Sequence, residues 1–214
     1  MASPIGAFAE ELVDFIEHFF GWLLTLFSDI LDLVLDFVGS ILTYLDPIIF
    51  IPVLVIVSLL ITKRLFMSLL IGAAFYIIYW MGYWNSAMAT LNMVLVATLV
   101  AVVLAVPLGI WAADSEKANP VIKALMDFMQ TMPAFVYLIP AVIFFGLGVV
   151  PGVVATVIFA MPPVVRLTNL GIRQVPPEMN EVADAFGSTG WQKLTKVQMP
   201  IAMPSIMAGI NQCI

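Results

Sequence analysis

The sequence has 214 residues, of which 63% are hydrophobic and only 10% are charged. Soluble domains have about 45–50% apolar and about 25% charged residues, so this composition excludes an ordinary water-soluble globule. Cysteine and histidine occur once each, which excludes an intrachain disulfide framework and a zinc cluster. Charge is also unevenly distributed, because half of the 14 acidic residues precede Gly39 whereas the first basic residue is Lys63.

Residues 1–45 are expected to form an acidic amphipathic helix. They lack the basic leading region of a secretory signal, so we interpret them as mature structure. Because large apolar residues would cover the other faces, we expect this helix to lie in the outer membrane interface with its polar stripe toward water. An equally good alternative to an interfacial helix is a helix that packs against neighbouring subunits. If the helix is broken, we expect the break near Gly21 or Gly39. The stripe recurs every three or four positions and consists of Glu10, Asp14, Glu17, Gly21, Thr25, Ser28, Asp32 and Asp36.

Long apolar runs predict five membrane spans after this helix, because about 20 apolar residues cross a bilayer. Residues 46–89 hold two of them, and residues 90–214 form the expected core membrane domain with three more. Pro133 and Pro140 predict kinks or an unwound start in the fourth span. A sixth apolar stretch begins at Pro200, and we expect it to be an incomplete span of a truncated chain. The five predicted spans are Pro47–Thr62, Leu65–Tyr83, Thr90–Trp111, a segment within Val121–Leu147, and Val153–Leu167.

Basic residues set the expected orientation, because cytoplasmic loops of membrane proteins carry the excess of lysine and arginine. All eight basic residues lie in or next to three segments: the first connection, the third connection and the segment after the fifth span. These three segments would lie on the same side of the membrane. The connections around Gly82 and Gly148 carry none. We therefore expect the basic connections to be cytoplasmic and the acidic N-terminal helix to be outside.

Residues 171–200 form the only sizeable polar stretch after the N-terminal helix. Pro176 and Pro177 predict a helix start and Gly187 a left-handed stop, which gives a short helix over 177–186. Thr189 and Gln192 have the spacing of a capping box, which predicts a second helix over 190–198. From these residues alone, an interacting segment and an ordinary helical loop are equally good interpretations.

Part of this polar stretch resembles a known signature, which reads E-A-A, three residues, G, nine residues and then I-x-L-P. The matching residues here are Glu181-Val182-Ala183, Gly187 after three residues, and Val197-Gln198-Met199-Pro200 after nine more. That signature is typical of permease subunits of binding-protein-dependent ABC importers, and the departures here are all apolar. The segments Met132–Asn180 and Pro204–Gln212 resemble one branch more closely, the glycine betaine/proline betaine permeases of compatible-solute importers. The resemblance extends from about Leu91 to the C-terminus.

The resemblance implies an all-α, polytopic membrane protein with the type I (MetI-like) importer permease fold. It implies a plasma-membrane transport subunit for quaternary ammonium osmoprotectants that is not itself an enzyme. In this family the polar segment contains the coupling helix, so Glu181, Ala183, Asp184 and Gly187 are the expected residues at an ATPase contact. The resemblance leaves the solute pathway unassigned.

The expected partners are a cytoplasmic ATPase, an extracytoplasmic binding protein, a second permease copy and the lipid bilayer, with no nucleic acid. The sequence has no phosphate-binding loop of the form G-x-x-x-x-G-K-[ST], so ATP and magnesium are expected at the ATPase and no cofactor or metal on this chain. The alternatives are an ion-coupled secondary carrier of small solutes and a membrane scaffold that transports nothing.

Overall fold

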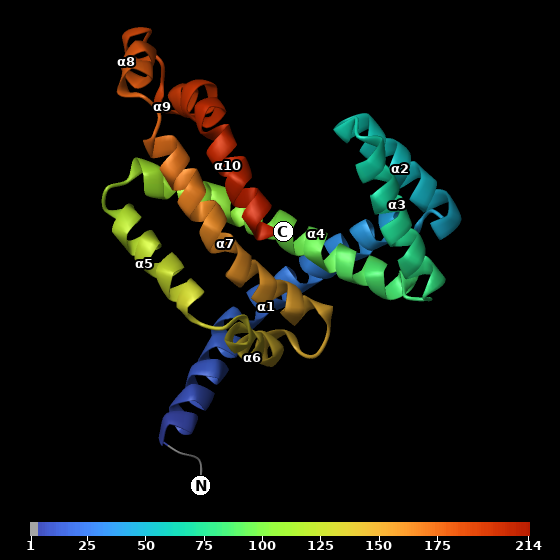
Figure 1. Cartoon of the computed structure of the whole chain (residues 1–214). Helices are drawn as coiled ribbons and strands as arrows, with labels where there is room; N and C mark the ends of the chain where they lie inside the picture. Colours follow the sequence, from blue (N-terminus) through green and yellow to red (C-terminus); the bar gives the residue numbers. More distant parts are fainter. Residues whose placement is uncertain (1–3) are drawn as a thin grey trace. The chain divides into compact units, whose positions relative to one another are not determined.

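The computed structural model describes the backbone of residues 4–214 and the side chains of residue 11 and residues 13–214. All regular elements in this described range are helices (Figure 1). Two compact units, Met1–Val96 and Ala97–Ile214, meet at a boundary inside α4 (Trp84–Asp114). Within the described range, α4 and α7 (Val149–Arg173) are each long and apolar enough to cross a bilayer, and up to four spans result if two sharply bent helix pairs each count as one.

The N-terminal helix α1 (Pro4–Thr43) runs unbroken through both Gly21 and Gly39, so the expected break is wrong. A glycine inside a helix costs only about 1 kcal/mol, which the neighbouring turns tolerate. At Gly39 the missing side chain has a packing reason. A Cβ there would lie 2.9 Å from Nδ2 of Asn92, and that amide donates a 2.9 Å hydrogen bond to the Leu35 carbonyl.

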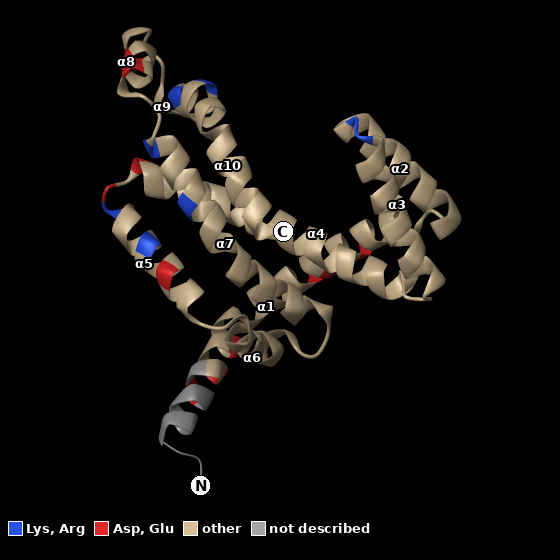
Figure 2. Cartoon of the chain, in the orientation of Figure 1, with Lys and Arg blue, Asp and Glu red and all other residues tan. Residues whose placement is uncertain are grey.

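The first unit also contains a tight helical hairpin of α2 (Pro47–Thr62) and α3 (Leu65–Trp80). The Asp46 carboxylate caps α2 by accepting a hydrogen bond from the Ile48 amide at 2.9 Å. The two helices approach so closely that a Cβ on Gly72 would lie 2.4 Å from Cγ2 of Val55. The two basic residues of this unit form the connection at the tip of the hairpin (Figure 2).

The second unit is built around the pair α7 and α10 (Met199–Cys213), which run side by side (Figure 1). Glycines make this packing close, because a Cβ on Gly171 would lie 2.8 Å from Cβ of Ser205. Small residues at helix contacts are a common means of packing helices inside membranes. Ile172 of α7 and Ala202 and Ile206 of α10 form the buried core between them.

The predicted fourth span is two helices, α5 (Ala118–Thr131) and α6 (Ala134–Phe145), that meet at 98°. The two helices count as one span only if the bent pair crosses the membrane together, and the break between them does fall at Pro133, one of the two prolines at which the sequence predicts kinks or an unwound start. Pro133 has no amide hydrogen, so it cannot donate to the carbonyl four residues before it, that of Met129. The Tyr137 hydroxyl donates a 2.7 Å hydrogen bond to this carbonyl instead. Pro140, in contrast, lies inside α6 and does not end that helix.

Candidate functional site

The polar segment begins with α8 (Pro177–Ala185), at the residues that the sequence predicts. Pro177 occupies the first helical turn, where its missing amide costs nothing. At the other end Gly187 adopts a left-handed conformation with φ of 73°. Its amide donates to the Asp184 carbonyl at 2.9 Å, and the Ser188 amide donates to the Ala183 carbonyl at 3.0 Å. This pair of bonds is a Schellman motif, which satisfies carbonyls that the helix end would leave unpaired.

The second predicted helix exists but does not end at Gln198. The capping box at its start is confirmed: the Thr189 hydroxyl accepts from the Gln192 amide, and the Gln192 side chain accepts from the Thr189 amide. From α9 (Gly190–Lys193) the chain continues through the π-helical turn η1 (Leu194–Gln198) directly into α10. Pro200 in the first turn of α10 removes one backbone amide, and the wider π turn precedes it.

Side chains tie α8 to α9 and η1. The Lys193 ammonium contacts both carboxylate oxygens of Asp184, at 2.8 and 3.0 Å. The Gln198 amide donates to the Asn180 side-chain oxygen at 3.1 Å. Ala183, on the same helix as Asn180 and Asp184, is buried. The segment from α8 to η1 is therefore held as one folded piece.

The structure separates the four predicted contact residues into two kinds. Glu181 and Gly187 are exposed, and the Glu181 carboxylate has no hydrogen bond or ion pair within the described residues. Ala183 faces its own segment and is only 6% exposed, while Asp184 is held by Lys193. Small size at position 183 thus serves internal packing, whereas Glu181, Gly187 and Asp184, which is still exposed beside Lys193, remain open to solvent.

Sequence reasoning missed an exposed apolar stripe on α8 and its cap. Met179, Val182 and Phe186 are 49%, 52% and 86% exposed. Their spacing of three and four positions places them on one side of a helix. That spacing, in a segment otherwise rich in polar residues, is the signal from which the stripe could be found.

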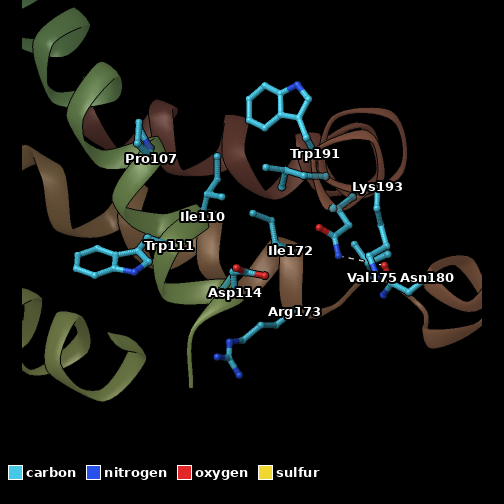
Figure 3. Close-up of a pocket in the computed structure, with 14 residues that line it drawn as sticks. Pro107, Ile110, Trp111, Asp114, Ile172, Arg173, Val175, Asn180, Trp191 and Lys193 are labelled. Carbon is cyan, nitrogen blue, oxygen red and sulfur yellow. Dashed lines mark hydrogen bonds between the residues drawn. The ribbon is translucent and has the colours of Figure 1, made fainter. Parts of the chain in front are cut away.

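A cavity of about 690 Å³ lies between this segment and the ends of α4 and α7. Figure 3 shows Ile110, Asp114 and Ile172 extending toward its centre, whereas the rings of Trp111 and Trp191 lie at its edge. The lining combines aliphatic side chains with separated polar groups. The folded segment is therefore not packed solidly against these helix ends.

Comparison with known proteins matches residues 105–212 to the family described as binding-protein-dependent transport system inner membrane component. This range includes α8, its cap and the π turn. The match therefore covers the whole of the folded segment described above.

Individual relatives extend the similarity beyond this range. The chain is 46% identical over 216 residues to the glycine betaine/carnitine transport permease protein GbuB of Listeria monocytogenes, which covers 99% of this chain and 76% of that protein. It is 45% identical to the glycine betaine transport system permease protein OpuAB of Bacillus subtilis, over 95% of this chain and 74% of that one. It is 55% identical over 131 residues to the glycine betaine/proline betaine permease protein ProW of Escherichia coli, over 61% of this chain and 37% of that one. With apolar helices long enough to cross a bilayer, the chain belongs to the family of binding-protein-dependent transport system inner membrane components and is a multi-pass permease subunit of an ABC importer.

Proposed function

We propose that this permease serves an ATP-driven importer of glycine betaine, proline betaine or a related quaternary ammonium osmoprotectant. The observation that carries this proposal is the similarity over nearly the whole chain to a permease named for glycine betaine and carnitine. The two other relatives described above are also named for glycine betaine.

The proposed importer contains two copies of this permease, two cytoplasmic ATPase subunits and an extracytoplasmic binding protein. ATP and magnesium are bound by the ATPase, since this sequence has no phosphate-binding loop. The segment from α8 to η1 lies on the cytoplasmic side of the plasma membrane, and α1 lies on the outer side.

In this proposal α8 is the coupling helix and enters a groove of the ATPase. Its apolar stripe, Met179, Val182 and Phe186, is exposed in the isolated chain and becomes buried at the contact. Burying one large apolar side chain contributes about 1.5–3 kcal/mol, so Phe186 is the principal anchor. Glu181, Asp184 and Gly187 lie at the same contact, and Asp184 also holds α9 through Lys193, while buried Ala183 packs inside the segment.

Motion of the ATPase reaches the membrane through the joint between the coupling segment and α10. The cavity of about 690 Å³ gives this segment space to shift against the ends of α4 and α7. The π turn η1 connects the segment to α10, and such turns often occur at functional positions in helices. A displacement of α8 is therefore transmitted to α10 and, through its close packing, to α7.

The test is uptake of radiolabelled glycine betaine at high osmolarity, in cells that lack their own betaine transporters. The cells express the permease with its ATPase and binding protein. We expect uptake only when all three are present, and continued uptake when a protonophore removes the proton gradient while ATP is maintained. Uptake by the permease alone, driven by an ion gradient, would show a secondary carrier instead.

The coupling proposal is tested in the same cells with Phe186→Ala. Loss of a buried aromatic anchor commonly costs 2 kcal/mol or more at an interface, so we expect retention of the ATPase to fall at least tenfold and uptake with it. Phe66→Ala is the matched control, because Phe66 is also strongly exposed but belongs to α3. Equal losses in both variants, at equal membrane levels, would contradict the assignment of α8.

A further inference from the structure

A second cavity, of about 310 Å³, lies between α5 and α7. Three basic side chains, Lys123, Arg166 and Arg173, line it together with two amides, Asn119 and Asn169. The cavity thus collects three of the eight basic residues of the chain. Both helices carry blue cationic positions in Figure 2.

The carboxylates near this cavity do not line it. Arg166 pairs with Asp127, and Arg173 donates to Glu116 at 3.0 Å, but neither acid belongs to the wall of the cavity. The Lys123 ammonium has no hydrogen bond or ion pair with the residues that the structure describes. Two of the three cations are therefore paired with carboxylates outside the wall, and Lys123 is the cation of this cavity that, in the described part of the chain, remains free for a ligand.

The rest of the wall is apolar. Ile122, Met126, Val165 and Leu170 contribute to it, and Leu170 remains 47% exposed. Asn169 donates a 2.7 Å hydrogen bond to the Asn119 side-chain oxygen, which links α5 to α7 across the groove. A wall that is cationic on one part and aliphatic on another matches an amphiphilic anion.

We infer that this groove binds the phosphate group of an anionic phospholipid. Basic pockets between membrane helices on the cytoplasmic side are typical sites for anionic headgroups. Lys123 would contact the phosphate, and Leu170 would contact the beginning of an acyl chain. The inference rests on the proposed orientation, which places this end of α5 and α7 at the cytoplasmic leaflet.

The experiment uses the full chain in nanodiscs of phosphatidylglycerol and phosphatidylcholine in equal amounts, followed by detergent extraction and native mass spectrometry of the retained lipid. We expect preferential retention of phosphatidylglycerol and about a fivefold lower apparent affinity for it in Lys123→Gln, since one basic residue near a membrane contributes about that factor. Lys196→Gln removes the same charge from η1, outside the groove, and should retain as much phosphatidylglycerol as the unaltered chain.

Leu170→Asn separates a lipid from a free phosphate ion, because only a lipid uses the apolar wall. Reduced retention of phosphatidylglycerol in this variant supports the lipid. Displacement of phosphatidylglycerol by millimolar inorganic phosphate, with no effect of Leu170→Asn, would overturn the lipid assignment. Equal retention in the Lys123 and Lys196 variants would overturn the site itself. Retention is measured without transport, so its outcome is independent of the solute proposed above.

Discussion

At the scale of single residues, Gly187 determines the shape of the coupling segment. Its φ of 73° is costly for residues with a Cβ, by about 1–2 kcal/mol, and most unfavourable for β-branched ones. A Cβ at this position would touch nothing, so backbone conformation alone makes the substitution costly. We expect Gly187→Val to lower the affinity of the permease for its ATPase about tenfold, measured by co-purification over a range of ATPase concentrations.

Two variants separate this effect from general damage. Gly187→Asn should retain most of the affinity, because asparagine tolerates the left-handed conformation. Gly82→Val introduces the same strain at φ of 78° with equally open surroundings, but between α3 and α4. Weaker ATPase retention in Gly82→Val than in Gly187→Val would contradict a specific role of the cap at the end of α8.

At the scale of elements, one hydroxyl group makes a hydrogen bond across the bend between α5 and α6. Tyr137→Phe leaves the Met129 carbonyl without the partner that replaces the missing Pro133 amide. Losing the hydrogen bond to this part-buried carbonyl costs about 1 kcal/mol, so we expect the midpoint of thermal unfolding in detergent to fall by about 2–4 °C. Tyr76→Phe, which removes a hydroxyl without a hydrogen bond to the described residues, should leave the midpoint unchanged.

Pro133→Ala tests the cause of this dependence. It restores an amide hydrogen that can donate to the Met129 carbonyl once Met132, now extended with φ of −92° and ψ of 138°, continues the helix α5. The effect of Tyr137→Phe should therefore be smaller in that background. Strictly additive shifts in the double variant would mean that the hydroxyl and the missing amide are unrelated.

Short-range signals explain which elements could be predicted. The bounds of α8 and the capping box of α9 follow from residues within a few positions, such as Pro177, Gly187 and Thr189. The right-angled bend after α5 could not be predicted, because Pro133 determines where a helix breaks whereas the packing of α6 on α7 determines its direction. The contact between Lys193 and Asp184 likewise joins two different helices and could not be predicted from local sequence.

At the scale of the whole chain, the apolar composition and the separation of acidic from basic residues along the sequence predict a membrane protein. The helices α4 and α7 confirm apolar spans near their predicted positions. The groove at Lys123 could not be predicted without knowing that α5 packs against α7. The residues that pair around it are about 40 to 60 positions apart along the chain. Local patterns thus locate these two spans, whereas sites between spans require the fold.

The orientation of these spans is a prediction for the whole chain, because every basic residue contributes to it. In a Cys213→Ser background, we expect Ser86→Cys to react with a membrane-impermeant maleimide in intact cells. Lys117→Cys and Lys196→Cys should react only after the membrane is permeabilised, which also serves as the control for accessibility. Labelling of Lys196→Cys in intact cells would place η1, and α8 folded against it, on the side opposite to ATP. No cytoplasmic ATPase could then contact Phe186, whatever solute the protein carries.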